Sequence, residues 1–322
     1  MTSPYSLSIL DQSPIGAGAT AAEALASTVD AVRHAERLGY HRYWVAEHHA
    51  SPGFASVAPE VLAAAMLART SGIRIGTGGV LLPRYPAEKV AEIFATLANL
   101  YPGRVDMGIG RAGASAHRFP EQLADLLRLL EGGSGGAPDR RLAVAPAVPP
   151  KLWLLGSGGD SAQIAGLLGS GFAFAHFLAP EAAESSLNAY RQSCLQATGE
   201  RSRGSVLTVR VVTADTAEKA DELAQAVLLW RVRKDVGRDL PIPSVQEARS
   251  AAWTAEERRQ ARLRRPALVV GTPQNVRGTL IALAEEFSAD EIMINTVTRG
   301  PVERIRMYEL LAEAFGLAKG PS

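Results

Sequence analysis

The sequence predicts a single α/β domain folded as a closed (β/α)8 barrel. Short apolar runs of strand character alternate with segments of helical period along all 322 residues, and eight such pairs follow one another. This alternation is typical of parallel strands joined by crossover helices, and eight units in about 300 residues match a closed barrel. A doubly wound open sheet is the alternative, but no strand–GxGxxG–helix segment opens the chain.

The first four units each pair an apolar strand with a helix. Their strands are expected at 6–12, 41–47, 73–82 and 104–110, and their helices at 20–38, 59–70, 86–100 and 119–130. Gly39 ends the first helix, and Pro86 stands in the first turn of the third, where proline is favoured.

The last four units are separated by two further segments. Their strands are expected at 151–156, 172–178, 205–215 and 291–297, and their helices at 162–169, 181–193, 216–234 and 302–316, with another helix at 273–287. We expect a flexible loop at 131–140, and the polar, arginine-rich stretch 235–265 as an excursion outside the barrel before the last strand. One barrel domain is therefore expected over 1–322.

Composition excludes several classes of function. Apolar residues make up 47% and charged residues 21%, as in an ordinary globular protein, and a net charge of +1 argues against a nucleic-acid partner. The N-terminus lacks the pattern of a signal peptide, and no apolar run approaches the ~20 residues of a membrane span. The single cysteine, Cys194, cannot form an internal disulfide, so we expect a cytoplasmic protein.

The stretch YWVAEHH places Glu47, His48 and His49 at the end of the second strand. Active sites of such barrels lie at the C-terminal ends of the strands, so these side chains are either solvated loop residues or part of a catalytic site. A zinc site is the rival hypothesis for paired histidines. Neighbouring residues of an extended chain point to opposite sides, and the sequence has no cysteine cluster or HExxH motif, so no metal is expected.

Two other strand ends carry candidate ligand contacts. The third strand contains Gly78 and Gly79 in GTGGVLLPRYP, which lack side chains where a ligand would approach, although a bulge or plain packing explains them equally well. The fourth strand ends in GIGRAGA and places Arg111 at the barrel mouth. This arginine is a candidate anion ligand or one half of a structural ion pair.

The fifth and sixth strand ends add further candidates. Ser157, Gly158, Gly159 and Ser161 in GSGGDSAQ precede a helix, where free N–H groups and the helix dipole favour a phosphate. An N-cap with a tight turn is the alternative for this segment. His176 follows the sixth strand and is either a residue of the barrel mouth or a buried histidine with its hydrogen bonds satisfied.

Several of these segments together resemble the bacterial luciferase-like, flavin-dependent monooxygenases. They are RYWVAEHH, IGTGGVLLPRYP, PGRVDMGIGRAGA, WLLGSGGDSAQIAGLLG and VGTPQNVRGTLIALAEEFSADEIMINTV, which cover nearly the whole chain. The resemblance implies a luciferase-like TIM barrel that binds reduced, diffusible FMN. It also implies that this flavin reacts with dioxygen to a C4a-hydroperoxyflavin, which oxidises a small organic substrate.

The resemblance also implies roles for single residues. His48 matches the catalytic histidine of the family, and we expect Glu47 to orient it. Gly78 and Gly79 match a segment beside the flavin that contains a non-prolyl cis peptide. Arg111 and the residues Ser157, Gly158, Gly159 and Ser161 match contacts to the flavin and its phosphate, and we add His176 to the cofactor contacts. Asp160 departs from the family pattern, and its charge opposes a phosphate unless it is turned away.

Two other functions are compatible with the same barrel: hydride transfer that depends on a deazaflavin (F420), and flavin binding without catalysis. No second glycine-rich strand–turn–helix is left for a nicotinamide dinucleotide. We therefore expect a separate NAD(P)H:flavin reductase as partner, and we also expect a homodimer.

Overall fold

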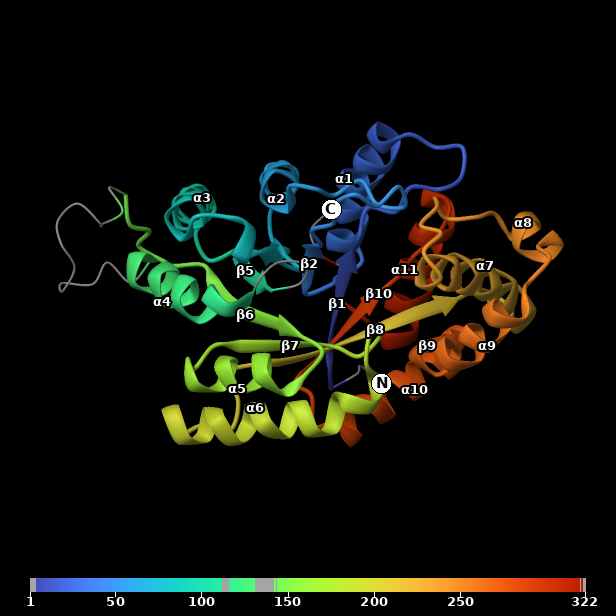
Figure 1. Ribbon diagram of the computed structural model, residues 1–322. Coiled ribbons are helices and arrows are strands. Elements are labelled where there is room, and N and C mark those ends of the chain that lie inside the picture. The colour runs from blue at the N-terminus through green and yellow to red at the C-terminus, as the bar shows by residue number, and fades with distance from the viewer. Residues whose placement is uncertain (1–3, 112–115, 131–141, 143, 319, 321–322) are drawn as a thin grey trace.

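The computed structural model describes residues 4–111, 116–130, 142, 144–318 and 320, and within them eight parallel strands close into a barrel (Figure 1). The barrel strands are β1 (Ser6–Asp11), β2 (Arg42–Val45), β3 (Arg74–Thr77), β5 (Val105–Gly110), β6 (Lys151–Gly156), β7 (Gly171–Ala175), β8 (Ser205–Thr213) and β10 (Glu291–Asn295). They pair in chain order, and β10 closes the ring by pairing with both β8 and β1. The predicted TIM barrel is thereby confirmed.

Helices cover the outside of the barrel (Figure 1). They are α1 (Ala21–Arg37), α2 (Pro59–Leu67), α3 (Ala87–Leu100), α4 (Phe119–Leu130), α5 (Gly159–Leu167), α6 (Ala183–Thr198), α7 (Ala217–Asp235), α10 (Pro273–Glu286) and α11 (Pro301–Phe315). The start of α1 is fixed by a capping box, in which Thr20 and Glu23 each accept a hydrogen bond from the other's backbone N–H.

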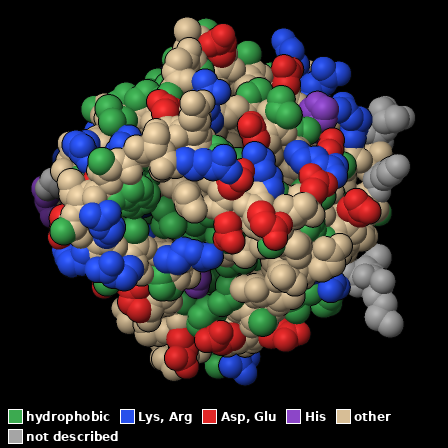
Figure 2. Space-filling model, turned by 90° about the vertical axis from the view of Figure 1, so that its right-hand side faces the viewer, with side chains coloured by type: hydrophobic (Ala, Val, Ile, Leu, Met, Phe, Trp, Pro, Cys, Tyr) green, Lys and Arg blue, Asp and Glu red, His purple; other side chains and the backbone are tan. Residues whose placement is uncertain are grey.

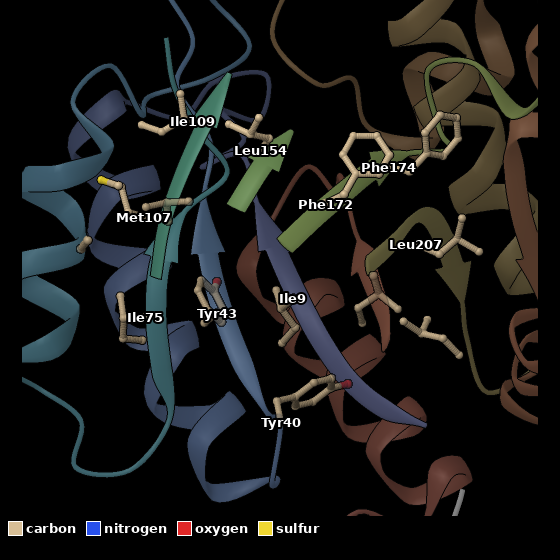
Figure 3. Packing of buried hydrophobic residues seen from close by; sticks show 14 of the residues in the cluster. Ile9, Tyr40, Tyr43, Ile75, Met107, Ile109, Leu154, Phe172, Phe174 and Leu207 are labelled. Atoms are coloured by element: carbon tan, nitrogen blue, oxygen red, sulfur yellow. The ribbon is translucent and has the colours of Figure 1, made fainter. Parts of the chain in front are cut away.

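The alternation of side chains along the strands produces two layers of core. Ile9, Tyr43 and Ile75 face outward and pack with the helices, and Figure 3 shows these side chains with others of the same cluster. Their chain neighbours Leu10 and Trp44 face inward, where they form an inner cluster with Trp153, Val206 and Met293. Because the interior is filled at this level, the space for a ligand lies nearer the barrel mouth.

A buried ion network fills the opposite end of the barrel, where the strands begin. Arg42 bonds Asp106 at 2.6 Å and Glu291 at 2.8 Å, and Arg74 bonds the other oxygen of Asp106 at 2.6 Å. Burial alone would raise the pKa of Asp106, but Arg42 and Arg74 outweigh it and lower that pKa. The network therefore consists of fully paired charges, as a buried ion cluster requires.

Three segments differ from the sequence-based expectation or add to it. The predicted strand 73–82 is split into β3 and β4 (Val80–Leu81), separated by Gly78 and Gly79. The stretch 235–265 contains two helices, α8 (Val245–Ser250) and α9 (Ala255–Arg264), which pack against α7. An unexpected strand, β9 (Leu268–Gly271), pairs with the end of β8. The predicted loop 131–140 lies outside the described residues.

Candidate active site

A cavity of about 550 Å³ opens at the C-terminal ends of the strands. Figure 2 views the molecule from the right-hand side of Figure 1, toward which β6 and β8 point, and shows a hollow of hydrophobic side chains with Lys and Arg side chains around it. The cavity brings together candidates from four strand ends: Glu47, His48, Gly78, Gly79, Arg111, Ser157, Gly158 and Ser161. Its volume is within the range of ~300–1,000 Å³ found for small-molecule sites.

His48 is held in one orientation by Gln12. The two side chains meet through Gln12 Nε2 and His48 Nε2, which are 3.0 Å apart. Gln12 Oε1 already accepts a hydrogen bond from Arg210 Nη2 at 3.1 Å, so the amide nitrogen of Gln12 faces the histidine as a donor. His48 Nε2 is therefore the acceptor, and in the neutral ring the proton is on Nδ1, which is buried and has no partner in the described structure.

The surroundings of His48 keep its ring uncharged. Burial, together with the positive charges of Lys234 and Arg210, lowers the pKa of His48 to about 4. Its ring also packs against Phe54, with 4.3 Å between the ring centroids. At neutral pH the cavity thus contains a neutral imidazole of fixed tautomer.

The expectation that Glu47 orients His48 is wrong. Glu47 accepts hydrogen bonds from the backbone N–H of Leu81 at 2.8 Å and from the hydroxyl of Tyr85 at 2.7 Å, and it contacts His49 Nε2 at 2.5 Å. The ring of His48 instead meets Gln12, and no hydrogen bond joins Glu47 to His48 within the described residues. Glu47 supports the segment after Gly78 and Gly79 instead.

The peptide bond between Gly78 and Gly79 is cis, as the resemblance implied. Both residues also pack tightly against neighbouring strands. A Cβ on Gly78 would lie 2.4 Å from Leu10 Cδ1, and a Cβ on Gly79 would lie 2.7 Å from the carbonyl oxygen of Gly108. Gly78 and Gly79 therefore have no room for a side chain, and the part of the cavity wall that they form is bare backbone.

Arg111 and the turn before α5 form the part of the cavity rim at the ends of β5 and β6, which follow β3 in the barrel order. Arg111 Nη2 donates to Asp160 Oδ2 at 3.2 Å, and the Asp160 side chain is 79% exposed. Gly158 is the N-cap of α5 and has no side-chain cap, and a Cβ there would meet nothing within 4 Å. The uncapped N–H groups of α5 and the open space at Gly158 therefore lie beside Arg111, whose partner in this structure is the exposed carboxylate of Asp160.

His176 does not line the cavity. It lies in the turn after β7, it is not among the residues that line the cavity, and its ring lies 6.0 Å from that of Phe287. The structure therefore does not support the predicted cofactor contact at His176, because this side chain is buried beside Phe287 and away from the cavity. Gly159, the first residue of α5, is also not among the lining residues.

Several residues of the cavity were not predicted from the sequence. Gln12 and Arg210 fix His48, while Phe54, Trp230 and Lys234 line the same region. Gln12 follows the first strand directly, so the strand-end argument that identified Glu47 applies to it as well. Arg210 is a charged residue in the buried strand SVLTVRVVT, an unusual position that itself indicates a specific role.

The described residues contain neither a metal-binding cluster nor a membrane-spanning helix. No group of three or more His, Cys, Asp or Glu side chains is arranged to hold a metal ion. No described helix combines the length and the apolar character needed to cross a bilayer.

Comparisons with known proteins agree with this geometry. A family model for luciferase-like monooxygenases matches residues 6–291. The N-acetyl-S-alkylcysteine monooxygenase of Bacillus subtilis (strain 168) is 34% identical over 336 residues, covering 97% of this chain and 99% of that protein. The crystal structure of apo-MsnO8 is 35% identical, with a TM-score of 0.87 and 98% of both chains covered. This chain belongs to the luciferase-like monooxygenase family.

A more distant structure shares the fold. It is the oxygenating constituent of 3,6-diketocamphane monooxygenase from Pseudomonas putida, a type II Baeyer–Villiger monooxygenase in complex with FMN. Its TM-score is 0.72 at 17% identity, and 98% of each chain is covered.

Proposed function

We propose that this protein is a monooxygenase that binds reduced FMN and uses dioxygen to oxidise a small organic substrate. The observation that carries the proposal is the cavity at the barrel mouth, where a neutral, oriented His48 faces the same space as the side-chain-free Gly78–Gly79 segment. The name of the Bacillus subtilis relative supports a small organic molecule as substrate.

The residues present fit a flavin mononucleotide. Its phosphate would be held by Arg111 and by the uncapped N–H groups that follow Gly158, with Ser157 and Ser161 beside them. Its ring system would lie against Gly78 and Gly79, where no side chain occupies the cavity. Binding would require the phosphate to replace Asp160 as the partner of Arg111. This exchange costs little because exposed ion pairs contribute only about 0–1 kcal/mol.

A bound reduced flavin supplies the electrons for oxygen activation, and the chain's own residues control protons and water around it. His48 is uncharged near pH 7, with its proton on the buried Nδ1 and its Nε2 toward Gln12, so it acts as a neutral, oriented group in proton transfer. Phe54, Phe177 and Trp230 provide apolar walls that limit the access of bulk water.

We infer that reduced FMN comes from a separate NAD(P)H:flavin reductase. One cavity of about 550 Å³ is suited to a mononucleotide and a small substrate together. The glycine-rich turn before α5 offers one phosphate site, whereas a nicotinamide dinucleotide needs a turn of its own for the pyrophosphate.

An anaerobic titration tests the cofactor. The protein is titrated with FMN, reduced FMN and a reduced deazaflavin, and each mixture then receives a pulse of oxygen. We expect reduced FMN to bind more tightly than the other two cofactors. We also expect oxygen to oxidise the bound reduced FMN more slowly than it oxidises reduced FMN free in solution. Preferential binding of the deazaflavin, with no reaction toward oxygen, would replace the proposal by a hydride-transfer function.

A further inference from the structure

The cavity has a positively charged end, defined here as Arg210, Arg231 and Lys234. Arg210 lies on β8, and the other two side chains come from α7, which follows it. In the barrel order β8 is opposite β3, after which Gly78 and Gly79 come. The positively charged end therefore lies across the mouth from the expected flavin position, on the side left for the substrate.

Arg210 is buried without a negative partner. Its side chain is on a residue only 5% exposed, and its hydrogen bonds go to two neutral oxygens, Asn295 Oδ1 at 3.0 Å and Gln12 Oε1 at 3.1 Å. No carboxylate in the described part of the chain forms an ion pair with it. Aromatic rings cover it instead, with Phe177 at 4.7 Å and Trp230 at 5.4 Å from the guanidinium carbon.

The other deeply buried arginines of the described structure are paired. Arg42 bonds Asp106, and Arg304 bonds Asp11 at 3.0 Å. An isolated buried charge is costly unless a partner compensates it. Arg210 differs from Arg42 and Arg304 in one further respect, since it lines the ligand cavity and they do not.

The nearby carboxylates are already occupied. Asp235 bonds Arg231 and Arg264, each at 2.7 Å, and Asp239 bonds Lys234 at 2.7 Å. Burial, with the charges of Arg231 and Arg264, lowers the pKa of Arg210 to about 9, so it is still a cation at neutral pH. Glu47 also borders the cavity, but its oxygens accept the hydrogen bonds that come from the segment after Gly79.

We infer that the substrate of the reaction proposed above is an organic acid whose carboxylate binds Arg210. The planar guanidinium matches a carboxylate, and the bound anion supplies the negative partner that the protein lacks. Phe54, Phe177 and Trp230 surround the apolar part of the molecule. The acid group thereby sets which end of the substrate enters first and which part faces the flavin and His48.

A matched pair of probes tests this inference without turnover. 3-Phenylpropanoate and 3-phenylpropanamide share shape and size but differ in charge, and ligand-observed NMR measures the affinity of each for the protein. We expect the acid to bind at least about tenfold more tightly, the equivalent of ~1.4 kcal/mol. Equal affinities, or tighter binding of the amide, would overturn the inference whatever the variants do.

Variants assign the preference to Arg210. Arg210→Met should reduce the ratio of acid to amide affinity to near one, whereas Arg210→Lys should keep part of it. Arg264→Gln is the matched control, because it removes a nearby positive charge that does not line the cavity, and it should keep the preference. The affinity for the amide reports whether the fold is intact. An unchanged ratio in Arg210→Met, with the amide bound as tightly as by the unmodified protein, contradicts the assignment. If both probes bind weakly to Arg210→Met, Arg210→Lys decides, and loss of the preference for the acid there would also contradict it.

The inference and the proposed function fail separately. A preference for the acid in the NMR experiment, without oxygenation in an assay coupled to a flavin reductase, would support the carboxylate site and refute the monooxygenase proposal. Oxygenation of neutral compounds, with equal binding of acid and amide, would refute the carboxylate site alone.

Discussion

Gln12 Nε2 lies 3.0 Å from His48 Nε2, and the same glutamine is held from behind by Arg210. The chain Arg210–Gln12–His48 links strands β8 and β1 to the exit of β2. It orients His48 and determines which ring nitrogen carries the proton, whereas the sequence had led us to expect Glu47 to orient this ring.

Replacing Gln12 by glutamate should change the charge state of His48. A carboxylate beside Nε2 favours the protonated ring, so we expect the pKa of His48 to rise from about 4 and substrate oxygenation to fall by roughly 10²-fold. NMR titration of the ring and a reductase-coupled assay measure the two effects. Gln192→Glu, the same exchange at an exposed position of α6, is the control. If the pKa of His48 is the same in Gln12→Glu as in the unmodified protein, Gln12 does not control the protonation of His48.

The low pKa of His48 should appear in the stability of the protein. The folded pKa, about 4, is below the ordinary value of 6.5, so the unfolded chain binds more protons between these pH values. The lowered pKa of His48 therefore makes the free energy of unfolding depend on pH. Its contribution to stability is fully present above pH 6.5, is lost as the pH falls toward 4, and amounts to at most about 3 kcal/mol. Urea unfolding at several pH values gives the free energy of unfolding as a function of pH. Between pH 4 and pH 6.5 this free energy should rise less steeply for His48→Gln than for the unmodified protein. Identical slopes would mean that His48 titrates normally.

Glu47 should act on structure and not on the protonation of His48. In Glu47→Ala the backbone N–H of Leu81 loses its acceptor, and we expect the free energy of unfolding to fall by about 1–3 kcal/mol. Glu92→Ala, on the exposed side of α3, should stay within about 0.5 kcal/mol. A large shift in the pKa of His48 in Glu47→Ala would restore the rejected role of Glu47.

Asp160 should compete with the phosphate of FMN. Asp160→Asn frees Arg111, so we expect FMN to bind several-fold more tightly, while Arg111→Ala should weaken binding by about tenfold or more. Fluorescence quenching of FMN measures both. Asp125→Asn, which opens an exposed ion pair with Arg128 on α4, serves as the control. Unchanged affinity in Arg111→Ala would remove the phosphate from this rim.

The sequence was sufficient for the barrel and for much of its mouth. The alternation of strands and helices specifies a closed parallel barrel, and that topology alone brings the ends of β2, β3, β5 and β6 together. His48, Arg111 and Ser161 therefore reach one cavity although they are far apart in the chain.

Side-chain direction was harder to predict. His176 was expected at the cavity because it follows a strand, but it lies in a turn, where the direction of a side chain does not follow from the strand pattern. Partners across the barrel, such as Gln12 and Arg210, depend on register between strands that are distant in sequence. Helices α8 and α9 have few apolar residues, so the periodicity did not predict them, although the capping-box pattern of Ser244 and Glu247 is visible in the sequence at the start of α8.

The central claim is that the barrel mouth uses reduced FMN made elsewhere, and oxygen consumption tests it most directly. The purified protein is mixed with NADH or NADPH, FMN and oxygen, with and without an added FMN reductase, in the presence of a candidate organic acid. Without the reductase we predict no oxygen uptake above background. With the reductase we predict oxygen uptake that yields oxidised substrate in addition to any peroxide released. Rapid oxidation of NADH or NADPH by the protein alone, or peroxide as the sole product with organic acids and neutral compounds alike, would contradict this account.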